Sequence, residues 1–178
     1  MKRQSRVCLL AGVLALGLLT GAAPAQTLTD EARAIASRWL LSACDLGGSA
    51  AQELRRIASP ALEVFLLEAL IRGPDFAQSA ELEQAASRRF EQRMQTLQRG
   101  EVRGLSREDI EQALKVSKQD FLAQEKNDFA LRYKSQAVAG LGVIRSVKAR
   151  PELQRLASDP KSPLQTSAKE ALLMQRRK

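Results

Sequence analysis

The sequence contains no histidine, and aromatic residues make up only 4% of its 178 residues. The absence of histidine removes the usual general base, the imidazole ligand of zinc sites and every Ser-His or Cys-His nucleophile pair. Most familiar hydrolase mechanisms are therefore excluded. β-Branched and aromatic residues are scarce beside Ala, Leu, Glu, Gln, Arg and Lys, so the composition favours helices over strands after the first segment.

Cysteine is also rare, with one residue at Cys8 and one at Cys44. Cys8 lies in the first apolar segment, so Cys44 is the only thiol expected in the mature chain and no internal disulfide can form. Residues 41–44 resemble a lipoprotein box, but they follow a polar and charged stretch instead of an apolar signal core. Leu40 and Cys44 share one helical face, which favours a buried and inert thiol over a reactive one.

The first segment has the pattern of a secretory signal peptide. Three basic residues open the chain, residues 7–20 are apolar, and Ala23 and Ala25 supply the small residues of a cleavage site. We therefore predict that residues 1–25 are removed and that Gln26 becomes the mature N-terminus. The alternative is an uncleaved anchor. Either outcome places the rest of the chain in the periplasm or outside the cell, and after cleavage we expect no stable membrane span.

Charge narrows the choice of partners. Loss of the three basic residues of the signal lowers the formal net charge from +8 to +5. A modest positive excess with few aromatic side chains argues against nucleic-acid binding, which needs a dense basic stripe or stacking platforms. Anionic envelope surfaces or acidic proteins fit better.

The remaining residues, 26–178, are predicted to form a single all-helical domain. Thr29 is an N-cap for a helix that extends to about residue 43, and Pro60 opens a helix that ends at Gly73-Pro74, with a short helix at about 50–58 between them. Apolar residues recur at three- and four-residue spacing along these helices. Leu66 is central in one such stripe, so we expect it to be buried.

Longer and more polar helices follow. Between about residues 76 and 99 the apolar positions occupy one face only, so the opposite face should be exposed. Ser106 and Asp109 form the pattern of a capping box after a loop that contains Gly100 and Gly104. Apolar spacing then continues to Phe121, and beyond Asn127 it indicates a further helix that is either separate or continuous with the previous one.

The C-terminal third shows an internal similarity. Residues 137–141 and 168–172 align at a spacing of 31 residues, and between them lies a Pro-x-Leu-x-x-Leu helix pattern at 151–156, followed by the turn Asp159-Pro160. This order resembles the HEAT-like helical repeat over residues 133–176. The resemblance implies an α-solenoid or irregular helical-repeat array, in which helix pairs gain their core by stacking on neighbours. A closed helical bundle is the alternative. Leu141 is a predicted core residue, and Ser162-Pro163 is a predicted helix start.

Catalytic groups are limited to carboxylates, lysines, hydroxyls and Cys44. Glu63 and Glu68 flank an apolar run, which leaves open a perturbed acid in a cleft at either position. We interpret both as solvated, with Glu68 paired to Arg72 four residues on. Asp120, Glu125 and Asp128 lack the spacing of a calcium loop and are interpreted as surface charge. No phosphate loop or paired-cysteine metal motif occurs. We therefore predict no catalytic residues, no metal and no cofactor.

Clusters of arginine are the remaining candidates for a binding site. Arg89 and Arg93 lie four residues apart with Arg88 beside them, so part of the cluster shares one helical face. A solvated face is the alternative interpretation. The leading functional hypothesis is a non-catalytic periplasmic or secreted interaction module that binds another envelope protein, acidic at the contact. The second is an accessory or degenerate enzyme that acts on an envelope polymer through carboxylates.

Overall fold

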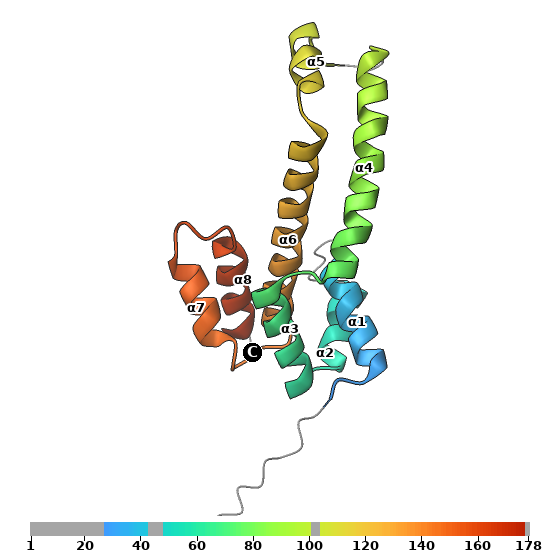
Figure 1. Ribbon diagram of the computed structural model, residues 1–178. Helices are drawn as coiled ribbons and strands as arrows, with labels where there is room; N and C mark the ends of the chain where they lie inside the picture. The colour runs from blue at the N-terminus through green and yellow to red at the C-terminus, as the bar shows by residue number, and fades with distance from the viewer. Residues whose placement is uncertain (1–26, 43–47, 101–103, 177–178) are drawn as a thin grey trace, which may run out of the picture.

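Eight helices and no strand are present in the part of the chain that the computed structural model describes, residues 27–42, 48–100 and 104–176 (Figure 1). The predicted all-helical class is confirmed. The helices are α1 (Asp30–Leu41), α2 (Ser49–Arg56), α3 (Pro60–Arg72), α4 (Phe76–Gln98), α5 (Arg107–Leu114), α6 (Lys118–Val143), α7 (Arg150–Ser158) and α8 (Gln165–Arg176).

Side-chain caps set most of the helix starts. In five helices the N-cap oxygen accepts a hydrogen bond from the backbone N–H three residues on, which satisfies a donor that the helix itself cannot pair. These caps are Thr29, Ser59, Asp75, Ser106 and Ser117. The first helix ends at Leu41, slightly before the predicted limit, and residue 43 lies outside the described residues.

Helix α6 is continuous through Asn127, and the break in this region falls earlier than the apolar spacing suggests. The Ser117 hydroxyl accepts a hydrogen bond from the Asp120 N–H at 3.0 Å and starts α6 directly after α5. No Gly or Pro marks this break. A serine that offers its hydroxyl to the backbone is sufficient to start a new helix.

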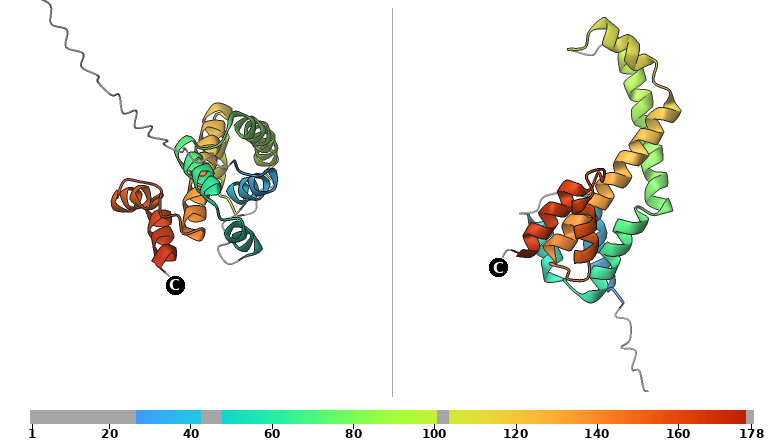
Figure 2. Two further views of the ribbon diagram at one scale, coloured as in Figure 1. Left: turned by 90° about the horizontal axis from the view of Figure 1, so that it is seen from below. Right: turned by 90° about the vertical axis from the view of Figure 1, so that its left-hand side faces the viewer.

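The second half of α6 is the centre of the body, which we define as α1, α2, α3, α7, α8 and residues 133–143 of α6. Figure 2 shows α7 and α8 on one side of this segment and α1 and α2 on the other, while α3 packs along it. Every residue from Gln136 to Val143 is buried. Leu66 and Leu141, the predicted core residues, are both fully buried, as predicted.

Two glycines allow neighbouring helices to approach α6 closely. A Cβ atom on Gly142 would lie 2.7 Å from the backbone Cα of Ala171 in α8. A Cβ on Gly140 would lie 2.8 Å from Nε1 of Trp39, which donates a hydrogen bond of 2.8 Å to the carbonyl of Gln136. Both distances are shorter than real Cβ contacts, so packing on two sides of α6 requires glycine.

The C-terminal helices occupy the region of the predicted repeat, but one boundary differs. Helix α8 begins at Gln165, not at the predicted Pro163, because Pro163 and Leu164 form a turn in which the Ser162 carbonyl accepts from the Gln165 N–H at 3.1 Å. The HEAT-like resemblance of residues 133–176 remains a prediction. Among the described residues, no helix is both long enough and apolar enough to cross a membrane.

Candidate functional site

Helices α4 and α5 and residues 118–132 of α6 form an arm that extends beyond the body (Figures 1 and 2). The two long helices run antiparallel and are joined by three ion pairs. Glu83 pairs with Lys126 at 2.5 Å, Arg89 with Glu125 at 2.5 Å, and Glu91 with Lys118 at 2.8 Å. These pairs connect α4 to the first half of α6 along the arm.

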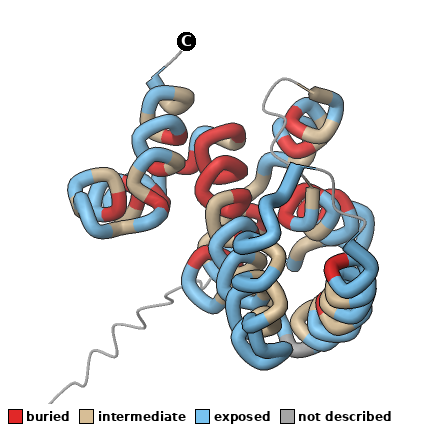
Figure 3. The backbone as a smooth tube through the Cα atoms, turned by 90° about the horizontal axis from the view of Figure 1, so that it is seen from above, coloured by how far each residue is buried: buried red, intermediate tan, exposed pale blue. Residues whose placement is uncertain are grey.

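The apolar seam of the arm is incompletely covered. The rings of Phe90 and Phe121 meet at a centroid distance of 5.4 Å, yet both side chains are only partly buried. Met94 and Leu122 are also partly buried, whereas Ala86 and Leu97 of α4 are buried. Figure 3 shows the consequence: buried positions concentrate in the body, whereas most of the arm is exposed or intermediate.

The three arginines of the predicted binding patch lie on α4 of this arm, and all are exposed. Arg89 faces α6, since its guanidinium pairs with Glu125. Arg88 lines an open groove between α4 and α6 that also contains Glu83, Lys118 and Leu122. Arg88 and Arg93 form no ion pair with any residue that the structure describes. The cluster is thus divided between one arginine that pairs across the arm and two that form no ion pair among the described residues.

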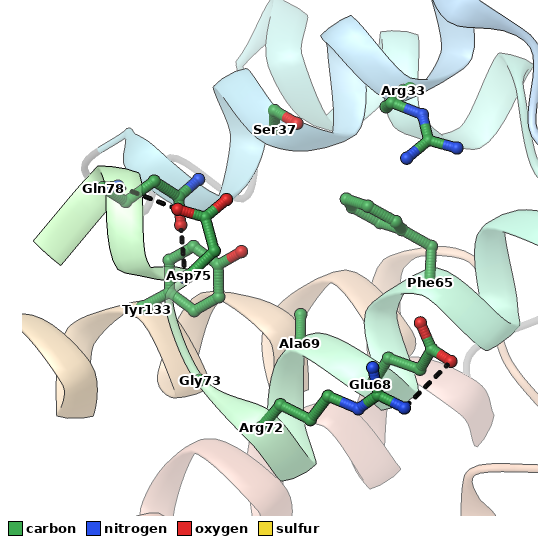
Figure 4. Close-up of a pocket in the computed structure, with 10 residues that line it drawn as sticks. All are labelled: Arg33, Ser37, Phe65, Glu68, Ala69, Arg72, Gly73, Asp75, Gln78 and Tyr133. Carbon is green, nitrogen blue, oxygen red and sulfur yellow. Dashed lines mark hydrogen bonds and ion pairs between the residues drawn. The ribbon is translucent and has the colours of Figure 1, made fainter.

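A pocket lies where the arm meets the body, and we call it the base pocket (Figure 4). It encloses about 280 Å³. Arg33 enters from α1, Phe65 and Arg72 from α3, and Tyr133 from α6, with the start of α4 closing one side. The ten lining residues are Arg33, Ser37, Phe65, Glu68, Ala69, Arg72, Gly73, Asp75, Gln78 and Tyr133.

The polar groups of the base pocket are partly committed to the fold. The Asp75 carboxylate accepts the Gln78 N–H at 2.8 Å, and the Gln78 side-chain oxygen accepts the Asp75 N–H at 3.1 Å, which completes a capping box. Burial raises the pKa of the Tyr133 hydroxyl, the Gln78 side chain opposes this shift by hydrogen bonding, and the nearby Asp75 charge adds to it. Tyr133 is therefore neutral at physiological pH.

Sequence reasoning did not find this pocket. Its lining residues come from four separate segments, and none of them forms a motif along the chain. The one partial signal was the pairing of Glu68 with Arg72, which the structure confirms at 3.9 Å between the charged atoms, with both side chains exposed.

Glu63 does not have the solvated setting that the sequence suggested. Only 12% of its side chain is exposed, and its carboxylate accepts hydrogen bonds from the Ser146 hydroxyl and from the Lys148 N–H at 3.2 Å. Because the partners belong to the turn after α6, helical spacing within α3 could not reveal them. Glu68 lines the base pocket, whereas Glu63, five residues earlier on α3, contacts the turn after α6 and does not line the pocket.

The other candidate groups have ordinary structural settings. Asp120 accepts a hydrogen bond from the Ser117 hydroxyl at 2.7 Å, and Glu125 is in the arm ion pair. The described residues contain no group of His, Cys, Asp and Glu side chains that could hold a metal ion. Cys44, the cleavage site before Gln26 and the last two basic residues of the chain lie outside the described residues.

In the part of the chain that the structure describes, fold and site together define an all-helical protein in which an arm of α4, α5 and the first half of α6 extends from a packed body. Comparison of the chain with models of protein families, with curated proteins and with solved structures found no match.

Proposed function

We propose that the protein is a non-catalytic periplasmic or secreted interaction module that binds another envelope protein through its arm. The observation that carries this proposal is the incompletely covered seam of the arm, where Phe90, Phe121 and Leu122 remain partly exposed. Apolar side chains that stay accessible after folding and are rimmed by polar residues are typical of protein interaction sites.

The shape of the arm supports the same function. Helix α4 has 23 residues, which at the rise of an α-helix gives a length of about 35 Å. Most of that length contacts only α6 and α5, so it contributes little to the core of the body. A partner helix that packs into the groove beside Leu122 would complete a three-helix seam. Arg88, which lines this groove, would then face acidic groups of the partner.

Capture of the partner tests the proposal. The exported protein is crosslinked in the periplasm and recovered, and the co-purified protein is quantified for wild type and variants. Leu122→Glu should abolish capture, and Arg88→Ser with Arg93→Ser should weaken it in a salt-dependent manner. Leu173→Glu and Arg55→Ser with Lys169→Ser are matched controls, because these exposed residues lie in the body.

The outcomes of this capture experiment decide whether the arm is the binding surface. Loss of capture in the arm variants only, with unchanged far-ultraviolet circular dichroism, supports the proposal. Equal capture by wild type and Leu122→Glu would overturn it. Intact mass of the exported protein tests the compartment separately, since cleavage before Gln26 is expected and a species that retains residues 1–25 would contradict it.

The second candidate function is an accessory enzyme, and the base pocket is the observation that favours it. Two arginines, a neutral tyrosine and the carboxylate of Glu68 line this pocket. The carboxylates of Glu68 and Asp75 lie on different sides of the cavity in Figure 4, and Asp75 caps α4. Turnover of an envelope polymer that is lost in Glu68→Gln or Tyr133→Phe, with the fold retained, would establish this function and displace the first.

A further inference from the structure

Charge is distributed unevenly along the chain. Residues 133–176 contain eight basic and three acidic residues, whereas residues 76–132 contain ten of each. Residues 27–75 contain five basic and seven acidic residues. The positive excess therefore belongs to the end of α6, α7 and α8, and residues 76–132, which include the arm, have no net charge.

Part of that excess gathers at one end of the body. Gln175, in the last turn of α8, donates from Nε2 to the Ser146 carbonyl at 2.8 Å and accepts from Nε of Arg150 at 3.3 Å. These two bonds hold the turn after α6, the start of α7 and the end of α8 together. We call the exposed residues on these three segments the basic end: Arg145, Val147, Lys148, Arg150 and Arg176.

The turn that presents these residues has a defined shape. The Ser146 N–H donates to the Leu141 carbonyl at 3.0 Å, and Arg145 adopts a φ of 54°, in the left-handed region where glycine is usual at a helix end. An arginine in this conformation costs about 1 kcal/mol or more relative to glycine. The Glu63 carboxylate accepts hydrogen bonds from the Ser146 hydroxyl and the Lys148 N–H and lies 3.9 Å from the Lys148 ammonium, whose side chain is still 65% exposed. The fold thus holds a cation at a position where glycine would be less strained.

The partner that fits this surface is indicated by Val147. With 70% of its surface exposed, Val147 is the most exposed of the large hydrophobic residues described, and basic residues lie on both sides of it in the chain. An apolar side chain between cations suits the boundary between acyl chains and anionic headgroups of a bilayer. An acidic protein would satisfy the cations but would not need a protruding valine.

We propose that the basic end attaches the protein peripherally to an anionic bilayer surface. Val147 enters the headgroup layer, and Arg145, Lys148 and Arg150 contact the anionic headgroups. Figure 1 places the end of α6 and the C-terminal end of α8 at the opposite end of the molecule from the tip of the arm. Attachment at the basic end therefore leaves the arm directed away from the bilayer, where a partner can reach it.

Vesicle co-sedimentation tests the proposal with the chain that begins at Gln26, which contains every helix described. The vesicles contain phosphatidylcholine alone, or phosphatidylcholine with about 30% of the anionic lipid phosphatidylglycerol. Wild type should bind only the anionic vesicles, more weakly as salt rises. Each cation near an anionic surface raises the binding constant about fivefold.

The decisive variant combines Arg145→Gly, Lys148→Ser, Arg150→Ser and Arg176→Ser, in which glycine preserves the left-handed turn. Its binding should fall at least about fiftyfold. Val147→Ser should weaken binding several-fold without changing its salt dependence. The matched control replaces four exposed basic residues of the arm, Arg88, Arg93, Arg99 and Arg107, and should bind as wild type does.

The proposal is overturned if wild type ignores anionic vesicles, or if the four-residue variant binds them as well as wild type does. Binding to poly-glutamate but not to phosphatidylglycerol vesicles would assign the basic end to an acidic protein instead, and would also overturn it. These results are independent of partner capture by the arm. The variants expected to lose vesicle binding change residues of the basic end, whereas the variants expected to lose capture change residues of the arm.

Discussion

The two halves of α6 show how one helix can serve two regions with different stability. Residues 136–143 are buried on every side, whereas residues 118–132 contact mainly α4 and are largely exposed. The backbone hydrogen bonding is the same in both halves. Stability in a helical protein comes mainly from tertiary packing and not from helix propensity, so the body should be stable and the arm should open locally at lower cost.

Truncation of the core should produce the largest effect. Leu141→Ala removes a fully buried side chain from the central segment of α6 and should lower the free energy of unfolding by about 2–5 kcal/mol. Leu131→Ala, on the same helix but exposed, should change it by less than about 0.5 kcal/mol. Urea unfolding of both variants measures the difference. Equal effects would contradict the division of α6 into a buried and an exposed half.

A single added methyl group, in Gly142→Ala, tests the close packing of the buried half of α6, because the change in stability should have the opposite sign to that in an open helix. In an open helix, glycine to alanine stabilises by about 0.5–1 kcal/mol. Gly142→Ala should instead destabilise by about 1–3 kcal/mol, because its Cβ would meet the Ala171 backbone at 2.7 Å and α8 would have to move. Thermal melting decides between the two signs, and a raised melting temperature would show that α8 is not held against α6.

Charge substitutions in the arm should have smaller effects. Arg89→Ser breaks the pair with Glu125, whose side chain is 27% exposed, and should cost about 0.2–1 kcal/mol. Arg88→Ser and Arg93→Ser should each change the stability by less than about 0.5 kcal/mol. Urea unfolding at low and high salt provides the test. A larger loss of stability for Arg88→Ser than for Arg89→Ser would contradict these roles, in which Arg89 stabilises the arm and Arg88 is left for a partner.

Acid should loosen the arm at its Glu91 link. The hydrogen bond and charge of Lys118 lower the pKa of the Glu91 carboxyl. The stability that this pair contributes is therefore present above the unfolded pKa of about 4.3 and is lost as the pH falls through the folded pKa. Amide exchange near residues 91 and 118, corrected for the intrinsic effect of pH, should accelerate as the pH falls below the unfolded value and through the lowered folded value. Glu91→Gln should remove this response.

Local signals in the sequence predicted several elements accurately. Thr29, Ser106 and Pro60 start helices at the expected residues, and Gly73 ends one, since capping and proline geometry depend only on neighbouring residues. The stripes that contain Leu66 and Leu141 also gave the correct core positions. The arginine cluster was found, but its division between Glu125 and solvent was not, because the ion pair joins residues 36 positions apart.

The sequence by itself determined an all-helical chain, its principal caps and its core stripes, because helix periodicity and capping are local. Only the tertiary structure decided that α6 passes from an exposed arm into the centre of the body, that Gly140 and Gly142 are required by neighbouring helices, and that Glu63 braces the turn at the basic end. Those features depend on contacts between residues distant in the chain. Periodicity within one helix can show that a face is apolar, but it does not specify which helix covers that face or how closely.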